Sequence, residues 1–74
     1  SFAIFPNPAT NELTLASITN SNSTWIIYDA LGNSVLTGAF NGATTKINLV
    51  GLPAGIYWIT TDTEIPQRFL ITSD

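Results

Sequence analysis

Short runs of alternating apolar and polar residues fill this chain, and turn residues separate them at the 8–12-residue spacing that is typical of β-sandwiches and barrels. No window shows the 3.6-residue period of an amphipathic helix. β-Branched and aromatic residues dominate the runs, which favours strands. We therefore predict an all-β domain of seven short strands, at residues 2–5, 11–17, 23–29, 34–40, 44–50, 55–62 and 67–72.

Alternation within these strands also predicts which side chains face the core. In the strand at 23–29, Trp25 and Ile27 share one face, while Ile26 and Tyr28 share the other. Because several strands are apolar on both faces in this way, we expect loops or a partner to cover part of the second face. The predicted core consists of Leu13, Leu15, Trp25, Ile27, Val35, Ile47, Leu49, Leu52, Tyr57, Ile59, Phe69 and Ile71.

Turn residues predict how neighbouring strands are joined. In "DALGNS", at 29–34, Asp29 favours the start of a turn and Gly32 supplies a positive φ. Together they predict a hairpin closed by a type I turn and a bulge. Asn41-Gly42 predicts a second hairpin with a type I′ turn, and the polar stretch "NSNS" at 20–23 predicts a loop. Pro66 has no backbone N–H, so we place it just before the last strand.

The stretch "LPAGIY" combines a turn with a candidate corner. Pro53 and Gly55 occupy the second and fourth positions of a predicted type I turn. In immunoglobulin-like sandwiches, a Tyr near the start of a strand donates its hydroxyl to backbone a few residues upstream. The spacing of Leu52, Gly55 and Tyr57 fits such a corner, with Leu52 packing into the core and Tyr57 holding the turn. The fold class predicted is therefore an immunoglobulin-like antiparallel β-sandwich.

Composition and charge limit the kind of partner. The chain has 74 residues, enough for one small domain, and only 9% are charged, against about 25% in a typical soluble chain. Its net charge is −3, and Lys46 and Arg68 are its only basic residues. Two cations cannot neutralise a row of phosphates, which excludes nucleic acid and a polybasic membrane contact. No apolar run approaches the length of about 18 residues that spans a bilayer. This balance suits an extracellular or cell-surface module.

The sequence offers little catalytic chemistry. It contains no His and no Cys, so it has neither an imidazole base nor a thiolate, and no base is present to activate a Ser. Asp62 and Glu64 lie two residues apart and could bind Ca²⁺, with Asp29 isolated in its own turn; solvated loop charges are the simpler interpretation. The same two carboxylates as a glycosidase pair would need a cleft for which a chain of this size has little room. We predict neither an enzyme nor a bound cofactor.

Two tryptophans and one glycosylation motif have alternative interpretations. Trp25 and Trp58 could stack on sugar rings if their faces are exposed, but in a core this small packing is the commoner role. "NST" at 22–24 matches an N-glycosylation sequon, which matters only in a eukaryotic secretory pathway, and we expect it to be accidental.

Four motifs stand in a recognisable order: "IFPNPATNELTL", "WIIYDALGNSVLTG", "INLVGLPAGIYWITT" and "RFLI". In this order the chain resembles the type A C-terminal sorting domain of proteins exported by the type IX (Por) secretion system of Bacteroidetes. The resemblance runs from about Ile4 to Ile71, and its most specific part is the Leu-x-x-Gly-x-Tyr motif. The residues that carry it are Pro6, Asn7, Pro8, Gly32, Leu52, Gly55, Tyr57 and Arg68.

The resemblance implies a non-catalytic secretion signal on an immunoglobulin-like sandwich. Its expected partners are components of the type IX translocon, which recognise the domain after periplasmic transit, and a sortase-like peptidase, which usually removes it. The cargo then reaches the outer-membrane surface or the medium. Because the chain starts at Ser1 and lacks Met, we expect residues 1–74 to be a single sorting domain cut from a larger secreted precursor. An edge strand could also pair between copies.

Two features leave alternatives open. Pro6 and Pro8 predict a stiff, extended entry segment that holds the preceding linker where a peptidase can reach it, or else they only protect an edge strand from pairing. At the other end, Arg68 alone replaces the lysines that often flank the last strand in the resembled family, and the chain ends in Asp74. If the translocon captures this strand, backbone pairing along 67–72 could suffice. The alternative function is a resident accessory sandwich, carbohydrate-binding or spacer, on an extracellular enzyme or adhesin.

Overall fold

Strands fill most of the chain, as the alternation predicts. The computed structural model describes residues 2–17, 24–40, 43–61 and 65–72. Every predicted strand is present, and each observed boundary lies within two residues of the predicted one. The strands are β1 (Phe2–Phe5), β2 (Glu12–Ser17), β3 (Thr24–Asp29), β4 (Ser34–Ala39), β5 (Thr44–Asn48), β6 (Gly55–Thr61) and β7 (Gln67–Ile71).

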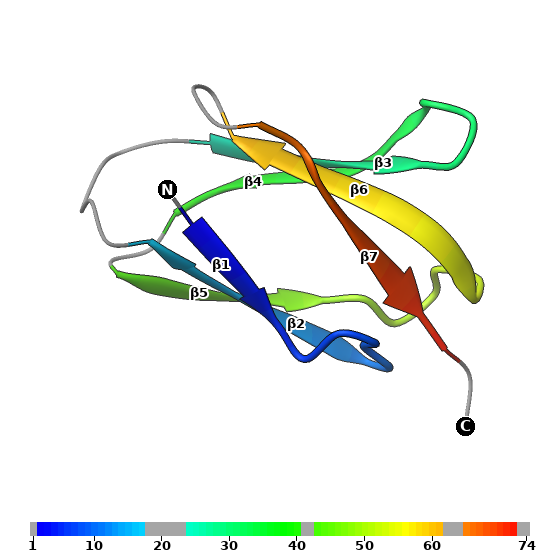
Figure 1. The fold of residues 1–74 in the computed structure, drawn as a ribbon, viewed down its shortest axis with the longest axis horizontal. Helices are drawn as coiled ribbons and strands as arrows, with labels where there is room; N and C mark the ends of the chain where they lie inside the picture. Colours follow the sequence, from blue (N-terminus) through cyan, green and yellow to red (C-terminus); the bar gives the residue numbers. More distant parts are fainter. Residues whose placement is uncertain (1, 18–23, 41–42, 62–64, 73–74) are drawn as a thin grey trace.

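The strands form two sheets that face each other (Figure 1). The first has the order β1-β2-β5 and the second the order β4-β3-β6-β7, and all neighbouring strands are antiparallel. The all-β immunoglobulin-like sandwich is therefore confirmed. Pro66 directly precedes β7, where its missing N–H removes nothing from the ladder.

The core lies between the sheets and is formed by the inward residues of five strands and their flanking segments. Alternation predicted ten of its members correctly. Ala9, which is fully buried, was not predicted, while Val35 and Leu52 are only half-buried and pack against the core from its margin. The buried apolar residues are Ala9, Leu13, Leu15, Trp25, Ile27, Ile47, Leu49, Tyr57, Ile59, Phe69 and Ile71.

A bulge in β4 explains why Val35 is only half-buried. Tyr28 pairs with Ser34 and Ile27 pairs with Leu36, so Val35 has no partner on β3. One unpaired residue reverses the facing of the residues beyond it. Leu36 therefore lies opposite buried Ile27, in the place that regular alternation assigns to Val35.

The turn at 49–52 corrects the prediction for "LPAG". The N–H of Leu52 donates to the carbonyl oxygen of Leu49 at 3.1 Å, and Gly51, third in this turn, has φ +99°. Residues 52–54 follow without a hydrogen-bonded turn, and Gly55 already begins β6. The glycine at 51 makes the earlier turn favourable because positive φ carries no steric cost there. Several other features lie outside the described residues: the "NSNS" loop, the sequon's Asn22, the Asn41-Gly42 hairpin, Asp62 and Glu64.

Candidate recognition surface

The Pro-Asn-Pro segment carries the chain from one sheet to the other. β1 pairs with β2 in the three-stranded sheet, and Ala9 then forms a parallel bridge with Ile71 at the edge of the four-stranded sheet. Between them, residues 6–8 are bent, with cis peptide bonds before Pro6 and Pro8. The expectation of an extended segment is therefore wrong, because the chain must change direction here to cross between the sheets.

Asn7 and Ala9 bond to the outer edge of the last strand. The N–H of Leu70 donates to Oδ1 of Asn7 at 3.2 Å. The carbonyl oxygen of Leu70 accepts from the N–H of Ala9 at 2.8 Å. One residue further on, the N–H of Thr72 donates to the carbonyl oxygen of Ala9 at 2.8 Å. The other edge of β7 pairs with β6. The C-terminal part of the last strand is thus hydrogen-bonded along both edges. The side chain of Asn7 supplies an acceptor that the backbone of a neighbouring strand would otherwise supply.

The Leu-x-x-Gly-x-Tyr motif forms the predicted corner. The Tyr57 hydroxyl donates to the carbonyl oxygen of Pro53 at 2.6 Å. The Tyr57 ring is buried and stacks on Phe69 of β7, with ring centroids 5.9 Å apart. Gly55, with φ +155°, pairs with Ile71, and Leu52 packs against the core below the turn. The corner therefore ties the start of β6 to the last strand.

Residues of three of the four resembled motifs meet along β7, although they are far apart in the sequence. Asn7, Arg68 and Leu70 line one hollow of about 390 Å³ on the outside of the sheet. Leu52 and Ile71 line a second hollow, of about 220 Å³, at one end of the sandwich. Gly32 belongs to neither hollow and lies in the β3–β4 hairpin.

That hairpin has the predicted geometry. The N–H of Gly32 donates to the Asp29 carbonyl oxygen at 3.0 Å, the N–H of Asp29 donates to the Asn33 carbonyl oxygen at 2.9 Å, and Gly32 has φ +89°. The Asp29 side chain closes the turn, because its Oδ1 accepts the N–H groups of Leu31 and Asn33, each at 2.9 Å. The Asn33 N–H, and after it the Leu31 N–H, hold the pKa of Asp29 below its ordinary value. One oxygen of this carboxylate is thus engaged by its own hairpin.

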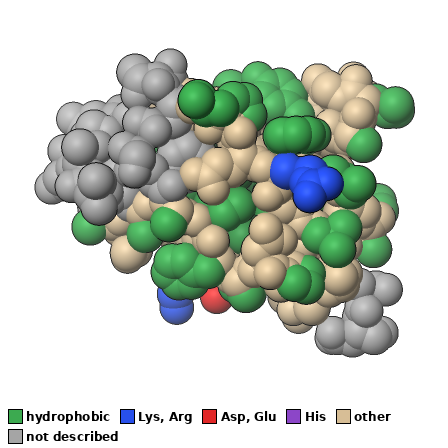
Figure 2. All heavy atoms as spheres, in the orientation of Figure 1, with side chains coloured by type: hydrophobic (Ala, Val, Ile, Leu, Met, Phe, Trp, Pro, Cys, Tyr) green, Lys and Arg blue, Asp and Glu red, His purple; other side chains and the backbone are tan. Residues whose placement is uncertain are grey.

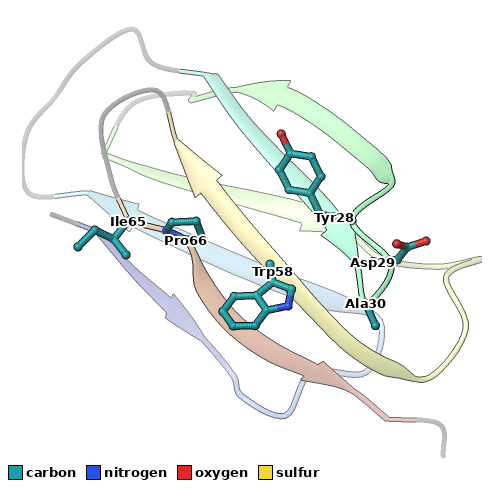
Figure 3. Close-up of a pocket in the computed structure, with 7 residues that line it drawn as sticks. Tyr28, Asp29, Ala30, Trp58, Ile65 and Pro66 are labelled. Atoms are coloured by element: carbon teal, nitrogen blue, oxygen red, sulfur yellow. The ribbon is translucent and has the colours of Figure 1, made fainter.

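The outer face of the four-stranded sheet carries an aromatic row that sequence reasoning did not single out as a site. Tyr28 on β3 pairs with Trp58 on β6, and Trp58 pairs with Arg68 on β7. Figure 3 shows the Tyr28 and Trp58 rings on neighbouring strands, with the Asp29 carboxylate pointing away from the Trp58 ring. Tyr28, Trp58, Ile65 and Pro66 line a shallow hollow of about 420 Å³. The signal available in the sequence was the second apolar face of these strands.

The two tryptophans differ in their exposure to solvent. Trp25 is buried under β4 and lies against Gly38, so its face is not available to a sugar. Trp58 has 40% of its surface exposed. A stacking role for Trp25 is therefore wrong, and only Trp58 has the exposure that such a role requires.

Within the described ranges, no group of three or more acidic, His or Cys residues is placed to hold a metal ion. The same part of the chain contains no helix long and apolar enough to cross a membrane.

Comparison with known proteins places these features in context. The family model described as "Secretion system C-terminal sorting domain" matches residues 3–71. Over 57 residues, the chain is 42% identical to an endo-acting ulvan lyase of Formosa agariphila, a match that covers 76% of this chain and 11% of the lyase. The chain thus spans about a tenth of the length of that relative.

A solved structure shares the fold. It is that of PorZ, an essential bacterial surface component of the type IX secretion system of Porphyromonas gingivalis, with a TM-score of 0.81 and 17% sequence identity. The similar region covers 97% of this chain and 11% of the PorZ chain.

Proposed function

The chain belongs to the family of secretion system C-terminal sorting domains of the type IX system, and from this premise we propose that its folded sandwich is recognised by components of the translocon after transit through the periplasm. Domains of this family are non-catalytic signals that direct a cargo to the cell surface or the extracellular space. The observation that carries the proposal is the family match, which runs from residue 3 to residue 71 and so includes both the Pro-Asn-Pro segment and the last strand.

The proposal has two further parts. Residues 1–74 act as one sorting domain of a larger secreted precursor. A sortase-like peptidase then cleaves in the linker before the sandwich and releases the cargo or allows it to be attached to the surface. The arrangement of β7 supports recognition of a folded domain rather than a linear peptide, because the Pro-Asn-Pro segment and the last strand, which are remote in sequence, lie side by side in the fold.

A fusion experiment tests the proposal. Residues 1–74 are attached to the C-terminus of a fluorescent reporter with a Sec signal and expressed in a Bacteroidetes host with and without a working translocon. We expect the reporter outside the cell only when the translocon works, and shortened by about the mass of the domain, 7.9 kDa. Reporter retained in the periplasm of the competent host would contradict the proposal.

The exposure of Trp58 supports a second candidate function, that of a resident carbohydrate-binding module on an extracellular protein. That function requires the domain to remain on the mature product. Export of the reporter at full length, with binding to an insoluble polysaccharide that is lost in Trp58→Ala, would favour it over the cleaved signal.

A further inference from the structure

The outer faces of the two sheets differ in chemistry. On the three-stranded sheet, the described outward residues are Ala3, Phe5, Glu12, Thr14, Ala16, Thr44, Lys46 and Asn48. On the four-stranded sheet they are Thr24, Ile26, Tyr28, Ser34, Thr37, Ala39, Ile56, Trp58, Thr60, Arg68 and Leu70. Only the second set has large apolar side chains on several adjacent strands. A sandwich that works alone needs no such face, because one side of an antiparallel sheet can remain polar toward water.

Four large apolar or aromatic side chains and one guanidinium lie on paired positions of three adjacent strands of this face. We call them the outer patch: Tyr28, Ile56, Trp58, Arg68 and Leu70. Ile56 pairs with Leu70 in the row next to Trp58 and Arg68. Ile56, Trp58 and Leu70 each expose 40–43% of their surface. Figure 2 shows hydrophobic side chains gathered around a basic one over β6 and β7.

We propose that the outer patch is the surface by which the folded domain docks on a protein of the secretion system, one that offers an apolar surface with a carboxylate to pair with Arg68. This inference rests on the proposed sorting function and names the surface that the recognition uses. The central row consists of Tyr28, Trp58 and Arg68, the three residue types that contribute most often to protein–protein binding energy.

Charge identifies the partner's polar group. Arg68 is the one charged residue among the described outward residues of this sheet, and it lies in a domain of net charge −3. A guanidinium surrounded by apolar side chains is desolvated on docking, and a carboxylate that accepts two of its N–H groups offsets that cost. The partner therefore carries Asp or Glu within an apolar area.

Two other occupants fit less well. A second copy of the domain brings the same cation, and the outer patch itself contains no carboxylate to pair with it. A saccharide stacks on flat aromatic faces, whereas the aliphatic side chains of Ile56 and Leu70 gain most from contact with other apolar side chains.

The fusion experiment of the preceding subsection, with substitutions on each sheet, tests the proposal. Trp58→Ser and Arg68→Glu alter the outer patch. Phe5→Ser and Lys46→Glu are matched controls, because these residues lie on the outward face of the other sheet, in one row through Thr14. Circular dichroism and thermal melting of each fusion establish that the domain is folded. We expect Trp58→Ser and Arg68→Glu each to lower export about tenfold or more, and the two controls to export normally.

Each other outcome has a distinct meaning. Failure of the unsubstituted fusion to export contradicts the sorting function itself. Normal export of folded Trp58→Ser and Arg68→Glu overturns the outer patch while leaving the sorting function intact. Loss with Trp58→Ser alone overturns the carboxylate pairing. A concentration-dependent dimer of the unsubstituted fusion that Trp58→Ser abolishes in sedimentation velocity overturns the assignment in favour of a second copy.

Discussion

The Tyr57 hydroxyl donates a 2.6 Å hydrogen bond to the carbonyl oxygen of Pro53, four residues upstream, and so fixes the turn that leads into β6. Tyr57→Phe keeps the buried ring and removes only this bond. We expect the free energy of unfolding to fall by about 1 kcal/mol, since water can still reach the exposed Pro53. Urea denaturation measures the change. Tyr28→Phe is the control, because the Tyr28 hydroxyl has no partner among the described residues, and an equal loss in both variants would contradict the role of the corner.

Gly38 and Trp25 make a second close contact. A Cβ atom at position 38 would lie 2.5 Å from Cζ2 of Trp25, a rigid ring atom that has little freedom to move. Gly38→Ala should therefore lower stability by about 1–3 kcal/mol through overpacking. Ser34→Ala, at an exposed position of the same strand, should change stability by less than about 0.5 kcal/mol. Thermal unfolding followed by near-UV circular dichroism checks both, and an unchanged melting temperature in Gly38→Ala would refute the contact.

Asn7 protects a single backbone amide of the last strand. In Asn7→Ala the Leu70 N–H loses its acceptor, so we expect its hydrogen exchange to become faster. The amides of Phe69 and Ile71 face β6 and should keep their protection. The cost in stability should be about 1 kcal/mol. NMR measures the exchange rate. If the Leu70 amide exchanges equally slowly in the variant, then the side chain of Asn7 is not the acceptor that protects it.

Asp29 predicts a loss of stability in acid. Because hydrogen bonds from the hairpin hold its folded-state pKa below the ordinary value of 3.8, the ionised side chain stabilises the fold above that pH. The contribution disappears as the pH falls through the folded-state pKa. Asp29→Asn should thus be less stable than the unsubstituted domain at pH 7, and the difference should shrink as the pH falls through the folded-state pKa of Asp29. Urea midpoints from pH 7 into acid measure this, and a difference that does not shrink would argue against the carboxylate as its source.

Sequence alternation was sufficient to predict the strands because inward-facing residues recur at every second position and turn residues mark both ends of each strand. Alternation failed to predict burial where one extra residue in a strand, or one small residue outside the strands, determines which side chain is buried. Val35 was assigned to the core because nothing in "SVLTG" reveals the bulge that moves Leu36 inward. Ala9 was missed because a small side chain next to a proline carries no periodic signal, and its burial depends on β7, which lies near the other end of the sequence.

The candidate site could be predicted only in part, for a similar reason. The corner at Tyr57 was predictable from local spacing, and the structure confirms its hydrogen bond. The role of Asn7 was not, because its partner Leu70 is remote in sequence. The row of Tyr28, Trp58 and Arg68 depends on the register of three strands, which alternation within each strand does not specify.

The bonds that join Asn7 to Leu70 and Ala9 to Thr72 each span 63 residues. Closing so long a loop has an entropic cost that must be met before the contacts form, and all-β domains dominated by such contacts fold in milliseconds to seconds. The order of events follows from this. Under the proposed recognition of the folded domain, a newly exported chain contains every motif but is recognised only after its two distant segments have met, so we expect sorting to begin with a delay set by folding.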